Sequence, residues 1–239
     1  MIKKSLSGIV VVLVIALVAV YFIGGMVISK VAVAGVEAFV PQVTKTDVSM
    51  GGLGVSPLTG SGEVNDFVLG NPEGFQSDYS IAFGRAHIDV APFSVLGDRI
   101  LIEKIHVYQP RFNYERKLLT SNINQILNNI KAASGRTVEE GENLPDEVKE
   151  TSIRIEIKEL IIEEAQVSMS MAGATVPVPV PEIVLRDLGT KDGGIPPDEM
   201  AFEVMSVVLR QVVEAAAKSP GGAVKGAADT IKNIFGGGD

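Results

Sequence analysis

The stretch IRIEIKELIIEEAQVSMSM, residues 153–171, determines the fold class. Apolar residues alternate with charged or polar residues in its first and last thirds, and this period predicts strands with one buried and one exposed face. The apolar members of the alternation are Ile153, Ile155, Ile157, Val167, Met169 and Met171. Residues 160–162 break the alternation, as a bend or a bulge between two strands would.

Residues 176–181, VPVPVP, predict a strand at the edge of a sheet. Backbone N–H groups of alternate residues point to the same side, so Pro177, Pro179 and Pro181 remove donors from one side only. The intervening valines keep their donors for pairing inward, and the outer side cannot pair with another chain. The alternative is a polyproline ligand for another domain, which would not need a valine at every second position.

Turn signals upstream delimit further short strands. The sequence Asn71-Pro72-Glu73-Gly74 is typical of a turn, because Pro fixes φ at its second position and Gly accepts a positive φ. We expect strands at residues 60–70, 79–90, 100–108 and 111–117, and a short turn of helix led by Pro92. Residues 37–190 therefore form the predicted β domain.

Two helices accompany the strands. Ser121 is a suitable N-cap for an inserted helix at residues 121–134. The apolar stripe of that helix consists of Ile123, Ile126, Leu127 and Ile130. Pro196 and Pro197 begin a second helix within residues 191–218, and a short amphipathic tail is expected at 219–239.

An uncharged apolar run of 21 residues occupies positions 8–28. As a helix it spans roughly 30 Å, the thickness of a bilayer core, so residues 1–30 are predicted to be a membrane anchor. The representative anchor positions are Gly8, Val12, Leu17, Tyr21, Phe22 and Ile28. Lys3 and Lys4 precede the run, which places the N-terminus in the cytoplasm and the bulk of the chain across the membrane.

A cleaved signal peptide is the alternative interpretation of the N-terminus. Ala32-Val33-Ala34 followed by Gly35 fits the small-residue pattern of a cleavage site. The apolar core of a signal peptide is about 7–15 residues long, however, and this run is longer. An uncleaved single-span anchor is therefore the favoured prediction.

The composition excludes several classes of function. A net charge of −8 disfavours nucleic acid as a partner, and the absence of cysteine excludes disulfides and thiolate metal sites. No phosphate-binding loop, dinucleotide fingerprint or nucleophile elbow occurs. His87 lies two residues from both Arg85 and Asp89, which indicates a surface charge cluster rather than a proton-transfer group, and His106 is expected to point away from the core. We therefore predict no enzyme activity, no metal and no cofactor.

Residues 58–130 resemble the N-terminal part of AsmA-family proteins, the bacterial relatives of bridge-like lipid-transfer proteins. One membrane span precedes the segment DFVLGNPEGF at residues 66–75, a strand ending in IDV, and a kink at 93–96. The segment ILIEKIHVYQPRFNYER at 100–116 and the Asn-rich helix SNINQILNNI at 121–130 complete the block. The later segments KELIIEEAQVSM and PEIVLRDLG are similar to that family's strand pair, so the resemblance covers roughly 150 residues.

The resemblance implies a curved antiparallel sheet whose apolar face shelters lipid acyl chains. Such a protein would be anchored in the inner membrane, stand in the periplasm and support lipid transfer or envelope homeostasis. The expected fold is mainly β with helices (α+β), with a sheet of about eight strands, so its groove would be only about 40 Å long. Among the strand residues named above, the alternating Ile, Val and Met side chains are the candidates for facing lipid.

The partners implied are membrane lipids and, as a further expectation, envelope proteins. The alternative function is that of a membrane-anchored structural or adaptor protein. Its C-terminal helix would then fill the apolar face, and the helices or the sheet edge would bind a partner. Whether that helix leaves a groove distinguishes the two hypotheses.

Overall fold

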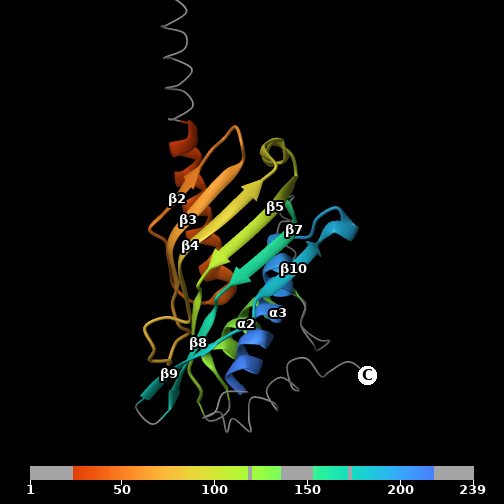
Figure 1. Ribbon diagram of the computed structural model, residues 1–239. Helices are drawn as coiled ribbons and strands as arrows, with labels where there is room; N and C mark the ends of the chain where they lie inside the picture. Colours follow the sequence, from red (N-terminus) through yellow and green to blue (C-terminus); the bar gives the residue numbers. More distant parts are fainter. Residues whose placement is uncertain (1–23, 118–119, 136–152, 172–173, 218–239) are drawn as a thin grey trace, which may run out of the picture.

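The computed structural model of this protein describes residues 24–117, 120–135, 153–171 and 174–217 (Figure 1). Within these residues, ten strands form one sheet. They are β1 (Val48–Ser49), β2 (Gly52–Val55), β3 (Ser61–Leu69), β4 (Ile81–Val90), β5 (Arg99–Tyr108), β6 (Arg111–Tyr114), β7 (Arg154–Glu163), β8 (Gln166–Met171), β9 (Ala174–Pro179) and β10 (Ile183–Leu188).

Several short strands are halves of longer, bent strands. β5 leads into β6 and β7 into β8 through residues in the left-handed region, Gln109 with φ 48° and Glu164 with φ 52°. The two bends lie side by side, because the Gln109 amide donates to the Glu163 carbonyl at 2.9 Å. The order is β3-β4-β5-β7-β10 in one half of the sheet and β4-β6-β8-β9 in the other. The bend expected at residues 160–162 lies slightly later, at Glu164, because β7 continues through those residues to Glu163.

The sheet is mixed, so the prediction of an entirely antiparallel sheet of about eight strands is wrong. β5 pairs with β7 and β6 with β8 in parallel, and all other pairs are antiparallel. A parallel pair needs a crossover of a dozen or more residues. The connection from β6 to β7 is long enough and contains the helix α2, Asn122–Ala133.

The first described element is a helix, Gly24–Thr44, which is long and apolar enough by length and composition to cross a membrane. Little of it is buried in the protein, but its last turn packs behind β3 and β4, where Val43 and Thr44 are buried. The expectation of strands from about residue 37 is wrong, because the helix continues to Thr44 and the first strand begins at Val48.

Three helical predictions are confirmed, the turn of helix led by Pro92, the inserted helix and the C-terminal helix, whereas the 3-10 helix at Thr190–Asp192 was not predicted. Pro92–Leu96 forms the short 3-10 helix η1, and Thr190–Asp192 forms a second one, η2. α2 has Ser121 as its N-cap, whose hydroxyl accepts from the Asn124 amide at 3.2 Å. α3 occupies Pro197–Ala217.

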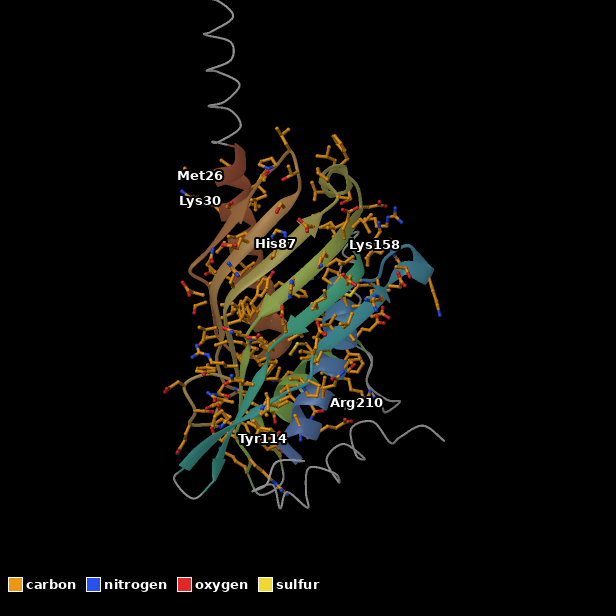
Figure 2. All side chains as sticks on the ribbon, viewed as in Figure 1. Met26, Lys30, His87, Tyr114, Lys158 and Arg210 are labelled. Atoms are coloured by element: carbon orange, nitrogen blue, oxygen red, sulfur yellow. The ribbon has the colours of Figure 1, made fainter. Side chains whose placement is uncertain are left out.

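The helices lie on one side of the sheet (Figure 1). Packing of α2 and α3 against each other, and of α3 against β7 to β10, produces the main core on this inner face. Its fully buried members include Ile126, Ile130, Val167, Ile183 and Val212. No helix covers the outer face among the described residues, and His87 and Lys158 lie on it (Figure 2).

Pairs of adjacent polar residues interrupt the inner apolar pattern in three neighbouring strands. In β5, Glu103 and Lys104 lie between Ile102 and Ile105, and equivalent pairs occur in the other two strands, as Lys158-Glu159 in β7 and Arg186-Asp187 in β10. These pairs are adjacent across the sheet and form ion pairs: Glu103 with Lys158 at 3.7 Å, Lys104 with Glu159 at 3.7 Å, and Arg186 with Glu159 at 3.0 Å. The outer face therefore carries a ladder of alternating charge.

The proline-spaced strand is an edge strand, as predicted. β9 pairs with β8 and is the last strand of its half of the sheet. Pro177 and Pro179 are exposed, whereas the Val180 amide donates to the Ala165 carbonyl at 2.8 Å. The side that lacks donors thus faces away from the sheet.

Candidate functional site: an apolar cavity under the sheet

A cavity of about 440 Å³ lies between the inner face of the sheet, the N-terminal helix and α3. This volume is in the range of ordinary ligand pockets, about 300–1,000 Å³. Side chains from the helix Gly24–Thr44, from β3 to β7 and from both α2 and α3 form its wall. They are Phe39, Val40, Val43, Thr44, Phe67, Leu69, Ile81, Phe83, Ile105, Val107, Pro110, Phe112, Ile130, Ile157, Leu160, Ile162, Pro197, Met200, Ala201, Val204, Met205 and Val208.

The wall offers no polar group to a ligand. Thr44 is its one polar residue, and its hydroxyl donates to the Val40 carbonyl at 2.7 Å and lies 2.9 Å from the Thr46 hydroxyl. Among the described residues, every buried side-chain nitrogen and oxygen has a hydrogen-bond partner. A molecule that enters the cavity would therefore be held by apolar contact alone.

The sheet contributes an aromatic pair to the wall. Phe67 of β3 and Phe83 of β4 are directly opposite each other, and their rings stack with centroids 4.8 Å apart. In a regular strand, residues three apart point to opposite faces. In β3 the left-handed residue Asp66, with φ 50°, shifts the alternation by one residue, so Val64 is buried and Phe67 also faces the cavity. The left-handed residue thus places the aromatic pair on the inner face.

The N-terminal helix and α3 supply the opposite wall. Phe39, Val40 and Val43 project from the last turns of the first helix, and Ala201, Val204 and Met205 from the first half of α3. On the sheet side, Phe83, Ile105 and Val107 are only half-buried.

The structure separates the strand residues that were predicted to face lipid. Ile157 is buried and lines the cavity, whereas Ile155 packs against the edge of the core. Val167 is fully buried in the core beside the cavity, and Ile153 precedes β7 and is exposed. The side chains of Met169 and Met171 lie outside the described part of the structure.

Of the predicted anchor positions, Ile28 lies on the described helix and is exposed to solvent. Gly8, Val12, Leu17, Tyr21 and Phe22 lie outside the described residues, as does the amphipathic tail expected at 219–239. The division of the chain into an anchor, a β domain, a helix and a tail therefore stays a prediction at both ends.

The histidines of the outer face are each paired with a carboxylate. His87 Nε2 lies 3.1 Å from Asp89 Oδ1, and His106 Nε2 lies 2.8 Å from Glu163 Oε2. The His106 ring also contacts the Tyr108 ring, at a centroid distance of 4.0 Å. No group of three or more metal-binding side chains occurs in the part of the chain that the structure describes. His87 thus contacts Asp89, as its spacing indicated, whereas Arg85 lies over the Tyr108 ring.

A polar cluster closes the end of the sheet near Tyr114 and the start of α2, and we call it the distal cluster. Its members are Asn71, Ser77, Ser80, Glu115 and Asn122. Asn122 Nδ2 donates to Asn71 Oδ1 at 2.8 Å and to the Asn113 carbonyl at 2.7 Å. Asn122 Oδ1 accepts from the amides of Glu115 and Ile123.

The Glu115 carboxylate joins the distal cluster to the turn at residues 71–77. It accepts from the amides of Gln76 and Ser77 and from the Ser77 hydroxyl, each at 2.8 Å at its closest oxygen. Burial alone would raise the pKa of Glu115, but these hydrogen bonds and the nearby Lys117 charge outweigh it and lower the pKa. Because all these groups are satisfied by one another, the cluster has a structural role.

Sequence reasoning missed the residues that the N-terminal helix contributes to the cavity. Phe39, Val40 and Val43 lie at i, i+1 and i+4, the spacing of one helical face, just beyond the apolar run. The β domain was expected to begin at residue 37, so these residues were not assigned to a helix. The aromatic pair Phe67 and Phe83 lies in strands that were correctly predicted, but their pairing partners were not.

Comparisons with models of known protein families, with curated proteins and with solved structures find no match for this chain.

Proposed function

We propose that this protein is a membrane-anchored lipid-binding protein that holds an acyl chain in the apolar cavity and supports lipid transfer in the cell envelope. The observation that carries the proposal is the composition of the cavity wall, in which Thr44 is the one polar residue and its hydroxyl is already bonded. A wall of this kind suits an aliphatic chain and excludes a polar metabolite.

The polar headgroup of the lipid would stay outside the cavity. A headgroup drawn into the cavity would lose its hydration without gaining a partner, because the wall has no free donor or acceptor. The acyl chain would enter where the wall is only half-buried, at Phe83, Ile105 and Val107, and the headgroup would remain in water.

The membrane attachment would come from the apolar run at residues 8–28, which continues into the described helix. Lys3 and Lys4 favour a cytoplasmic N-terminus and a periplasmic sheet. The same helix supplies Phe39, Val40 and Val43 to the cavity, so the anchor and the binding site would share one continuous element. A curved sheet and membership of the AsmA family are part of this proposal.

The test compares the full chain with a variant in which the cavity is filled. Ala201→Phe adds a ring to the wall, and Val204→Phe is a second variant with the same purpose. Each protein is purified in a non-ionic detergent after expression in a bacterial host, and the phospholipid retained per chain is measured by mass spectrometry. We expect both variants to retain less phospholipid than the parent, because the added ring occupies the space of the acyl chain. The anchor and the lipid around it are unchanged, so the loss can be assigned to the cavity.

Val184→Phe is the matched control, since it adds the same ring on the exposed outer face. It should retain as much phospholipid as the parent, and circular dichroism should show that all variants are folded. A photoactivatable phospholipid with its reactive group in the acyl chain gives an independent readout. Cross-links confined to residues 8–28, with none on the cavity wall, would contradict lipid binding in the cavity and favour the adaptor function.

A further inference from the structure

Exposed apolar side chains gather at one end of the molecule. Phe93 is 86% exposed, Leu96 83% and Leu58 78%, values that are unusual for large apolar residues. Every large apolar side chain that is exposed in the described residues lies at this end, with the single exception of Val184. Besides Phe93, Leu96 and Leu58, the exposed apolar residues at this end are Met26, Val27, Ile28, Val31, Val95 and Ile153.

These residues belong to one continuous surface, which we call the apex: residues 24–31, 55–62 and 90–97, with Ile153. The Val90 amide donates to the Gly60 carbonyl at 3.0 Å, which joins the two loops. A Cβ atom on Gly25 would lie 3.0 Å from the Val55 carbonyl oxygen, so the helix begins against the first loop. Figure 1 shows the helix and both loops at the same end of the sheet.

The apex loops carry no charge. VSPLTGSG at 55–62 and VAPFSVLG at 90–97 contain no Asp, Glu, Lys or Arg, although charged residues follow immediately on both strands. The second loop is a fixed turn, because the Ser94 hydroxyl donates to the Ala91 carbonyl at 2.7 Å and accepts from the Leu101 amide at 3.0 Å. A fixed, uncharged turn that exposes Phe93 and Leu96 is typical of a surface that contacts another apolar phase.

We propose that the apex docks on the phospholipid bilayer in which the N-terminal helix is anchored, with Leu58, Phe93 and Leu96 inserted into the interfacial region. The position of the predicted anchor argues for this occupant, because the apolar run 8–28 overlaps the apex at residues 24–28 and so puts the apex at the end of the predicted span. The two uncharged loops then meet the interface without placing a charge in it. This inference rests on the proposed membrane attachment but not on the cavity.

Docking would fix the sheet in a defined orientation on the membrane. Three contacts in addition to the helix, from two loops on different strands, prevent the domain from swinging about a single tether. The strands β3, β4, β5 and β7 would then run away from the bilayer, and the cavity would lie below the apex at a constant distance from the membrane surface.

The absence of cysteine from the chain makes a clean test possible. Single substitutions Leu58→Cys, Phe93→Cys and Leu96→Cys are introduced into the full chain, labelled with an environment-sensitive fluorophore and reconstituted into phosphatidylcholine vesicles at about one chain per vesicle. We expect emission shifted to the blue and quenching by phospholipids that carry a nitroxide in the acyl chain. Val184→Cys on the outer face and Gln76→Cys at the opposite end are the controls, and both should report water.

A label at position 12, introduced as Val12→Cys, separates the two proposals. If that label is quenched by the lipid nitroxide while those at 58, 93 and 96 report water, the anchor is correct and the docking is wrong. If all four labels report water, the membrane attachment itself fails. A blue shift without lipid quenching would mean that another protein surface covers the apex, which would also overturn the proposal.

Discussion

The two ends of the sheet differ in which kind of side chain they bury and which kind they expose. At the distal cluster, polar side chains are buried and bonded to one another, and Ser80 and Asn122 have no exposed surface. At the apex, apolar side chains stand in solvent on loops without charge. The polar groups of the distal end therefore find their partners within the chain. The apolar side chains of the apex lack an apolar partner unless another molecule or a membrane covers them.

The difference shows how stability and function are separated along one sheet. The buried hydrogen bonds of the distal cluster hold β4, β6, α2 and the turn at 71–77 together, so their loss would be felt by the whole fold. The apex side chains are mostly exposed, so they should contribute little to folding, and in the docking proposal they serve to hold the domain on the membrane. Three variants test this contrast, from the largest expected effect to the smallest.

The largest effect is expected from Asn122→Ala in the distal cluster. This substitution leaves the amide of Glu115 and the Asn113 carbonyl without their partner in a partly buried site, and it empties the fully buried position of the Asn122 side chain. We expect the free energy of unfolding to fall by about 3 kcal/mol, since each buried unsatisfied group costs about 1–3 kcal/mol. Urea unfolding of the full chain in a mild detergent, followed by circular dichroism, measures the change.

Gln125→Ala is the matched control for Asn122→Ala. Gln125 is on the same helix and half-buried, and its amide makes one long hydrogen bond to Asn129 at 3.4 Å. Its loss should cost no more than about 0.5 kcal/mol. Equal effects of the two substitutions would show that the helix, and not the buried cluster, carries the stability of this end.

A smaller effect is expected from acidification, through Glu115. Its pKa in the folded protein lies below the ordinary value of 4.5, so the unfolded chain binds the proton more readily. The stabilisation from this carboxylate is present above the ordinary value and is lost as the pH falls through the folded pKa. Its size should be no more than about 1 kcal/mol, because water screens the partly exposed carboxylate.

Glu115→Gln isolates that contribution, because the variant cannot titrate at this position. We expect it to be less stable than the parent at pH 7, and the difference to shrink as the pH is lowered below about 4.5. Urea midpoints of both proteins across this range decide the matter. A difference that stays constant with pH would show that the carboxylate stabilises through its shape and not through its charge.

Local patterns in the sequence predicted single elements better than the connections and pairings between them. The N-cap Ser121, the stripe of α2 and the 3-10 helix at Pro92–Leu96 depend on near neighbours and were found at the expected places. The parallel pairing of β5 with β7 depends on residues more than fifty positions apart. The predicted helix at residues 121–134 between two strands was nevertheless a signal for a crossover connection. Such a connection indicates a parallel strand pair, and that inference was not made.

The candidate site was predictable in kind but not in place. Alternating apolar residues indicated an apolar face, and Ile157 does line the cavity. The cavity also needs the last turns of the N-terminal helix, whose packing on β3 and β4 is a tertiary contact that no local pattern specifies. The pairs of adjacent polar residues in β5, β7 and β10 would have been a usable signal, because each reverses the alternation at the same level of the sheet.

The smallest effect on stability is expected at the apex, from Phe93→Ser combined with Leu96→Ser. Both side chains are more than four-fifths exposed, and the turn that carries them is held by the hydroxyl of Ser94 and not by their own contacts. In detergent, the urea midpoint should therefore correspond to a change in the free energy of unfolding below about 0.5 kcal/mol.

In phospholipid nanodiscs, the amides of residues 91–97 should exchange with deuterium faster than in the parent, because the side chains proposed to insert into the bilayer are gone. Ser94→Ala is the control that should loosen the turn in both media. A double variant as destabilised as Asn122→Ala would mean that the apex belongs to the packed fold, and the contrast between the two ends would then be lost.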